Sequence, residues 1–326
     1  AGASAAIAAG QQVIMQSVTE SYWGKLSSEF GRGWNRFWFT PVSSAPLGLI
    51  RLVIGLVAIF WYLSFYPDLQ FFFGPDGIID PNTLEQWRGP VAVFSIFDWP
   101  QSAASLWFTY WVGLGALVLF TVGLFSRVTS VVAFVVVISL IHRGPMLARP
   151  MEDVLAMVML YLCIGPSGGA FSLDRLWRKQ STSTGDSIAT PPSTSANIAL
   201  RLIQVHLALI HFAMAIGQLR DDSWWMGRAM WGFIGKTDSA YIDMTWLADY
   251  MYLLNLWTHG IVIFEFAFAL LIWNRLARPI LFAAAVLVWG SVALVSGMVD
   301  FALVMLAATL AFVPPEWLLR RRDARV

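Results

Sequence analysis

A series of long apolar stretches constrains this chain more than any other feature, since each can cross the roughly 30 Å hydrocarbon core of a bilayer. Several are shorter than the usual length of about 20 residues, chiefly the third, fourth and eighth. The runs are continuous rather than alternating, which favours helices over a membrane β-barrel. The sequence therefore predicts an all-α polytopic membrane helix bundle with about eight transmembrane helices. The predicted spans are 46–66, 103–124, 127–142, 151–165, 196–217, 250–273, 276–297 and 299–313.

The composition agrees with a membrane location. Of 326 residues, 58% are hydrophobic and only 13% are charged, whereas an ordinary soluble domain has roughly 25% charged residues. A water-soluble fold and intrinsic disorder are therefore disfavoured. The net charge of +1 gives no field that would attract nucleic acid, so membrane lipid is the expected partner. Cys163 is the only cysteine, which excludes an intrachain disulfide and a zinc site built from several cysteines.

The distribution of Lys and Arg predicts the orientation. With the N-terminus inside, 13 basic residues fall in cytoplasmic segments and six on the opposite side, while Arg51 and Arg201 lie within spans. This asymmetry follows the positive-inside rule. An even number of spans places both ends on one side, in agreement with the basic run RRRDAR near the C-terminus. We expect a multi-pass protein of the bacterial cytoplasmic (inner) membrane with both termini in the cytoplasm.

The spans group into two halves around a polar segment. Residues 46–179 form a first four-span half, and residues 198–326 form a second four-span half with a basic C-terminal tail. Between them, residues 180–197 are rich in Ser, Thr and Pro, which predicts a flexible cytoplasmic linker. Residues 1–45 form an N-terminal segment, and within it residues 17–40 carry aromatic residues beside basic ones. They predict an amphipathic interfacial helix, with an ordinary packing helix as the alternative.

Polar side chains inside the apolar stretches are the candidates for a functional site, because such groups are costly at membrane depth and tend to face protein. In 196–217, polar and small residues recur within about 100° of helical arc, which predicts one polar stripe. A second cluster occupies about 120° of 250–273. The stripe consists of Arg201, Gln204, Ala208, His211, Ala215 and Gln218, and the cluster of Asn255, Thr258, His259 and Glu265.

Glu265 is the residue whose position within the membrane needs the most explanation. A carboxylate there must be protonated, paired with a cation or exposed to water. We expect the stripe and the cluster to face each other across an interior pocket. Arg201 is the strongest candidate to offset Glu265, and a protonated histidine is another possible partner. His211 is expected to lie nearer His259 and Asn255. Interhelical hydrogen bonds that only fix packing are one alternative, and a proton path is another.

Secondary candidates are charged residues elsewhere in the first half. Arg51 is a further possible partner for Glu265, and Arg143 and Arg149 precede the acidic pair Glu152 and Asp153. Acidic residues that open a helix are also explained by the helix dipole. No standard catalytic motif is present, and the four histidines lack a ligand spacing, so we expect no metal site.

Seven segments, taken in order, resemble the HTTM family, the membrane domain shared with vitamin K-dependent gamma-carboxylase. The resemblance extends over about residues 33–320. The segments are WNRFWFTPVSSAPLGLIRLVIGL, FFFGPDGIID, VGLFSR, GGAFSLDRLWR, RLIQVHLALIHFAMAIGQLRDDSWWMGRAMW, LWTHGIVIFEFAFALLIWNRLARPILF and GMVDFALVMLAATLAFVPPEWL.

The resemblance implies a bundle of about eight helices and, in the carboxylases, deprotonation of vitamin K hydroquinone by a lysine. The position that matches this lysine is Gln218, and a glutamine amide cannot act as a base near neutral pH. The carboxylase histidine at the start of the fourth span is replaced here by the MEDV region. We therefore expect no gamma-carboxylase activity.

Three functional classes follow from the sequence. The first is an HTTM-type protein that binds a quinone-like or lipid-like ligand in the polar pocket. The second is a structural or accessory subunit of a larger membrane protein complex, which would use the Trp-rich loops to contact other subunits. The third is a transporter of protons or small ions around Glu265, which ranks last because the halves show no repeat.

Overall fold

The computed structural model describes residues 22–79, 84, 93–99, 102–181, 191–235 and 240–315. Within these ranges the chain is helical, and its only β-type pairing is an isolated bridge between Val42 and Ser193. The predicted all-α class is therefore confirmed for the described part of the chain. Much of the predicted linker and the whole basic C-terminal tail lie outside the described residues.

Six helices are long and apolar enough to cross a membrane. Three of them belong to the first half of the chain and three to the second. They are α2 (Ala45–Ser64), α5 (Ala103–Val122), α6 (Ser126–Arg143), α9 (Thr194–Gln218), α12 (Met251–Leu271) and α13 (Arg278–Ser296). The chain is thus a multi-pass membrane protein whose lipid-facing surface is helical.

The two remaining predicted spans are helices, but shorter ones. The α7 helix (Pro150–Ile164) has 15 residues and α14 (Val299–Thr309) has 11, followed by the short 3₁₀ helix η5 (Leu310–Phe312). At 1.5 Å per residue, α7 is about 22 Å long, less than the hydrocarbon thickness. A full count of eight spans stays a prediction.

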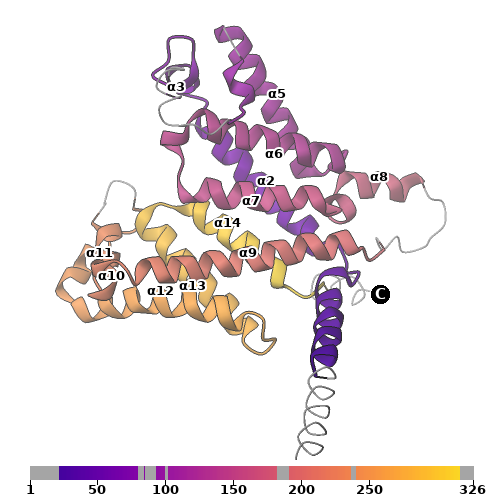
Figure 1. Ribbon diagram of the computed structural model, residues 1–326. Helices are drawn as coiled ribbons and strands as arrows, with labels where there is room; N and C mark the ends of the chain where they lie inside the picture. Colours follow the sequence, from indigo (N-terminus) through magenta and orange to yellow (C-terminus); the bar gives the residue numbers. More distant parts are fainter. Residues whose placement is uncertain are drawn as a thin grey trace, which may run out of the picture.

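Both short helices pack mainly against other helices, although each keeps some exposed side chains. In Figure 1, α7 and α14 run through the middle of the molecule, between α2, α5 and α6 on one side and α9, α12 and α13 on the other. The α7 helix contacts α2, α6 and α9, and α14 contacts α2, α7, α9 and α13. Because each contacts helices of both halves, they join the two halves into one core.

Smaller elements gather at the two ends of the bundle (Figure 1). The segments α3 (Leu69–Phe73), α10 (Asp222–Trp225) and α11 (Ala229–Ile234) lie at one end, which we call the α10 end, and α8 (Leu173–Ser181) lies at the opposite, α8 end. The other short 3₁₀ helices are η1 (Ile96–Asp98), η2 (Pro145–Leu147), η3 (Ser167–Gly169) and η4 (Thr245–Asp249).

Local sequence explains where the long helices begin and end. Proline occupies the first turn of α2, α7 and α13, where its missing N–H costs nothing. Ser102 and Ser105 form a capping box at the start of α5, and Gly123 ends that helix in the left-handed conformation (φ 72°). A side chain at Gly123 would also collide with the Arg51 guanidinium, since an added Cβ would lie 2.3 Å from its Nη1.

The helix over residues 22–39 runs crosswise to the long helices at the α8 end (Figure 1). Its end is fixed to the start of α9, because Asn197 Nδ2 donates to the Phe37 carbonyl (2.7 Å) and the Arg201 guanidinium lies 4.3 Å from the Phe37 ring centroid. Most of its aromatic side chains are exposed, among them Trp23 and Phe30.

A close crossing of α2 and α5 depends on Gly113. Tyr62 and Tyr110 stack with ring centroids 4.6 Å apart, and each hydroxyl donates to the carbonyl of the other residue (3.1 Å). A Cβ at Gly113 would lie 2.5 Å from the Tyr62 hydroxyl, whereas Gly115 on the same helix has open space around it.

We predict opposite effects for alanine at these two glycines. Gly113→Ala should destabilise the protein by about 1–3 kcal/mol, because the buried tyrosine pair must shift. Gly115→Ala should leave stability unchanged or raise it by up to about 1 kcal/mol through helix propensity. Thermal unfolding of the purified protein in mild detergent measures both, and equal midpoints for the two variants would contradict the close crossing.

Candidate functional site

The polar stripe of α9 is buried at five of its six positions. Gln204, Ala208, His211, Ala215 and Gln218 are all inside the bundle. Arg201, the first residue of the stripe, is half-buried at the α8 end. The helical spacing thus identified the face of α9 that packs against the other helices.

His211 and Glu265 form a completely buried pair between α9 and α12. His211 Nδ1 and Glu265 Oε2 share a short hydrogen bond, and both side chains are fully inaccessible to solvent. Aromatic rings surround the imidazole, with the centroid of Phe268 at 4.0 Å, that of Phe264 at 5.6 Å and that of Trp289 at 5.8 Å. Such an apolar enclosure makes the pair costly to break, because the remaining partner would keep an unpaired polar group.

The partner of Glu265 is therefore a histidine rather than Arg201, the strongest candidate from the sequence. Arg201 Nη1 donates to Gln204 Oε1 (2.9 Å), and its Nε donates to the Phe37 carbonyl (3.3 Å). Arg51 donates to the carbonyls of Ser167 (2.9 Å) and Phe171 (2.5 Å). Each arginine lies near enough to the α8 end of its helix to reach backbone carbonyls there, so His211 is left as the partner of Glu265.

Asn255 and His259 also have other roles than expected. His259 Nδ1 lies 2.9 Å from the Asn255 carbonyl, its Nε2 lies 3.3 Å from the Trp225 carbonyl, and the Asn255 amide donates to the Gly227 carbonyl (2.8 Å). Both side chains hold the turn between α10 and α11 against α12, one or more helical turns away from Glu265. Gly227 has φ 70°, and a Cβ there would lie within 3 Å of both side chains.

A cavity of about 640 Å³ adjoins the buried pair. Residues of α7, α9, α11, α12, α13 and α14 line it, together with Trp224 of α10. Its polar lining among the described residues is limited to Asp153, His206, Gln218, Glu265 and the indole N–H groups. The remaining lining side chains are apolar or aromatic. Gln204, Arg201, Asn255 and His259 do not line it.

Several polar atoms beside this cavity have no hydrogen-bond partner among the described residues. Glu265 Oε1, Gln218 Oε1 and the Trp289 Nε1–H belong to cavity-lining side chains, and His211 Nε2 belongs to the hydrogen-bond partner of Glu265. Buried polar atoms are almost always hydrogen-bonded in folded proteins. Three of these four atoms belong to side chains that line the cavity, which makes this cavity a candidate for a functional site.

The secondary candidates other than Arg51 lie near the α10 end, where Glu152 and Arg149 form a small network. Glu152 is buried, and its carboxylate accepts hydrogen bonds from Trp61 Nε1 (2.9 Å) and from the Arg149 backbone N–H (2.7 Å). Arg149 also pairs with Asp300 of α14 (2.9 Å). Arg143 donates to the Ile79 carbonyl (3.0 Å). Glu152 thus caps α7 and ties it to α2, and Asp153 is the member of this group that faces the cavity.

The turn after α9 is held by Asp221, which lies outside the membrane-spanning segments. Its carboxylate accepts from the Ser223 hydroxyl (2.5 Å) and backbone N–H (2.7 Å). These hydrogen bonds, the one from the hydroxyl first, lower the pKa of the Asp221 carboxyl below its usual range. The ionised carboxylate caps α10 and so positions Trp224 at the cavity.

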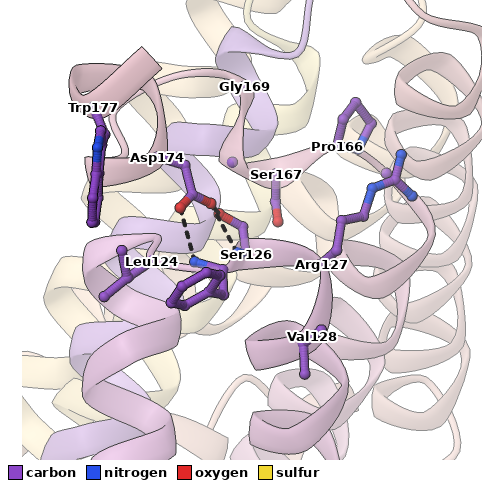
Figure 2. Close-up of a pocket in the computed structure, with 12 residues that line it drawn as sticks. Leu124, Ser126, Arg127, Val128, Pro166, Ser167, Gly169, Asp174 and Trp177 are labelled. Atoms are coloured by element: carbon purple, nitrogen blue, oxygen red, sulfur yellow. Dashed lines mark hydrogen bonds between the residues drawn. The ribbon is translucent and has the colours of Figure 1, made fainter. Parts of the chain in front are cut away.

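A second cavity, of about 730 Å³, lies at the α8 end, where the VGLFSR and GGAFSLDRLWR segments meet. Figure 2 shows Asp174 pointing at the start of α6, where it accepts hydrogen bonds from the backbone N–H groups of Phe125 (2.8 Å) and Ser126 (2.9 Å). None of the orphaned buried atoms belongs to its lining. We therefore regard Asp174 as a helix cap and the cavity beside the His211–Glu265 pair as the candidate functional site.

Comparison with protein-family models, curated proteins and solved structures gives no match to this chain. Within the described residues, no group of three or more His, Cys, Asp or Glu side chains is arranged to hold a metal ion.

The sequence did not point to Trp289, which lines the cavity and contacts His211. A signal was present, because Ala285, Trp289 and Ala293 are spaced by four residues and all three are buried. A large residue between two small ones on one helical face is typical of an interior contact between helices.

We predict that the contributions of His211 and Glu265 to the free energy of unfolding are coupled. Glu265→Leu should destabilise the protein by about 3–5 kcal/mol, because His211 would remain buried without a partner, and Glu265→Gln should cost less because an amide keeps a hydrogen bond. In the double variant His211→Leu/Glu265→Leu, the loss should be clearly smaller than the sum of the single losses. Thermal unfolding in detergent measures each variant, and strictly additive losses would contradict the pair.

Proposed function

We propose that this integral membrane protein binds an amphipathic small molecule, of a lipid-like or quinone-like kind, in the cavity beside His211 and Glu265. The observation that carries the proposal is that three side chains lining a mostly apolar cavity have buried polar atoms without a hydrogen-bond partner among the described residues. A volume near 640 Å³ is within the range of about 300–1,000 Å³ that is typical of small-molecule sites. The polar side chains of the lining would hold a head group, and the apolar and aromatic side chains would hold a tail.

We propose membership of the HTTM family on the seven ordered segments and on the helical architecture that they predict. Gln218 stands at the position of the carboxylase lysine and lines the cavity. Its amide can hydrogen-bond a ligand but cannot remove a proton near neutral pH. This argues for a binding role at the same place without gamma-carboxylase chemistry.

The helix over residues 22–39 is proposed to lie in the headgroup layer. On a helical projection, Lys25, Arg32 and Arg36 share one face, while most of the aromatic residues occupy the other. Aromatic rings beside basic residues suit the membrane interface. The crosswise direction of this helix relative to the spans (Figure 1) supports this position.

The α8 end is proposed to face the cytoplasm of a bacterial cell. The support is the excess of basic residues on that side and the positive-inside rule. Asn274, between α12 and α13, would then be cytoplasmic, and Asp243, before α12, would be on the opposite side. Both side chains are exposed, so cysteine at either position is accessible to a reagent.

We predict one-sided labelling of these two positions. In a Cys163→Ser background, Asp243→Cys should react with a membrane-impermeant maleimide added outside intact cells, and Asn274→Cys should react only after the cells are opened. The reverse pattern would contradict the proposed orientation, and labelling of both from outside would contradict a crossing by α12.

The binding proposal is tested by filling the cavity. Ala156 of α7 lines it, whereas Leu160 on the same helix is exposed and is not part of its lining. Native mass spectrometry after gentle solubilisation should find a small molecule retained by the unmodified protein and by Leu160→Trp. Ala156→Trp should lose that molecule, because the indole occupies its space.

Two outcomes would contradict this proposal. If no small molecule is retained by any form, or if Ala156→Trp retains it as well as Leu160→Trp does, the cavity is not the binding site. A protein that co-purifies in fixed ratio, without a bound small molecule, would favour the role of an accessory subunit.

A further inference from the structure

The charges around the cavity discriminate between head groups. Two carboxylates, Asp153 and Glu265, line the cavity, and no lysine or arginine is among its described lining residues. His206, whose Nδ1 shares a hydrogen bond with the Tyr161 hydroxyl (2.8 Å), is the one described lining residue that could carry a positive charge. An anionic head such as a phosphate or a fatty-acid carboxylate would therefore enter beside two carboxylates and with at most one cationic partner. Moving such a charge out of water without compensation is strongly unfavourable.

The unpaired oxygens of Glu265 and Gln218 require a head group that donates hydrogen bonds. If His211 carries the shared proton, Glu265 is a carboxylate and its Oε1 is an acceptor. If Glu265 carries the proton on Oε2, Oε1 is a carbonyl oxygen and is again an acceptor. Gln218 Oε1 is a second acceptor on the same cavity. The requirement for a donor therefore holds for either location of the proton.

Aromatic and methionine side chains complete the lining. Trp224, Phe233, Trp289 and Phe301 all contribute to the cavity wall. Ring faces attract cations, and the attraction is stronger where water is excluded. Four methionines also line the cavity, and methionine side chains adapt to apolar chains of different shape. They are Met157, Met214, Met230 and Met298.

From this combination we infer that the ligand is a cationic amphiphile, in which a protonated amine is attached to a long apolar chain. The inference rests on the proposed function and specifies its ligand class. The ammonium donates to Glu265 Oε1 and Gln218 Oε1, and Asp153 adds negative charge to the lining. The Trp289 N–H needs an acceptor, which a hydroxyl group next to the amine would supply, so an amino alcohol would satisfy all three orphaned atoms.

Three probes with the same chain and different heads test this inference: dodecylamine, dodecanol and dodecanoic acid. Equilibrium binding of each radiolabelled probe, below its micellar concentration, is measured at pH 7 on protein in nanodiscs of phosphatidylcholine. Nanodiscs that contain Ala156→Trp have the same lipid bilayer, so subtracting their signal leaves the binding that depends on the cavity.

We expect dodecylamine to bind about tenfold or more tightly than dodecanol, since a hydrogen bond to a charged group is stronger than one between neutral groups. Dodecanoate should show no binding that depends on the cavity. Glu265→Gln should remove most of the preference for the amine while dodecanol still binds. If that variant does not fold, Asp153→Asn provides the second test, with a smaller and salt-dependent loss of amine binding.

The possible failures are distinguishable. Dodecanol or dodecanoate binding as tightly as dodecylamine would overturn the inference and leave the proposed function in place. A preference for the amine that survives both Glu265→Gln and Asp153→Asn would also overturn it. Absence of cavity-dependent binding for all three probes would overturn the inference and the proposed function together.

Discussion

The hydrogen bond between His211 and Glu265 is the interaction on which the second half of the bundle depends. Neither side chain can face lipid, because each would then lose its hydrogen-bond partners in a medium without water. Their contact fixes which faces of α9 and α12 meet, and the surrounding rings of Phe264, Phe268 and Trp289 then follow from that choice. The same arrangement places Glu265 beside the cavity, with one carboxylate oxygen bonded to His211 and the other without a hydrogen-bond partner among the described residues.

The sequence predicted most of the architecture because the bilayer imposes strong rules on composition and length. The six long helices lie within or close to the predicted ranges. The short helices α7 and α14 are less predictable, because hydropathy does not distinguish a helix enclosed by protein from one that crosses lipid. Eight of 15 residues in α7 and seven of 11 in α14 are buried, and this burial depends on neighbours distant in the sequence.

The candidate site was predictable only in part, for a geometric reason. Helical spacing identified the buried face of α9 and selected Glu265, but it does not give the depth of a residue relative to residues on another helix. Arg201 and Glu265 were therefore expected to pair, although Arg201 bonds to Phe37 and Gln204 at the α8 end. Trp289 was not predicted because the candidates were selected by polarity, whereas the signal for Trp289 is the four-residue spacing of Ala285, Trp289 and Ala293.

Arg51 has a consequence for how the chain is inserted into the membrane. The residue lies in the first long helix, is fully buried, and donates to carbonyls that are 116 and 120 residues further along the chain. When α2 leaves the ribosome, none of these acceptors has been synthesised. The positively charged Arg51 side chain therefore has no hydrogen-bond partner in the protein at that stage. Arg51 must stay at the aqueous interface, or be shielded by the insertion machinery, until α7 and η3 arrive. The first half is therefore expected to become stable only as a unit, with α2 in a provisional position until α5, α6 and α7 have been made.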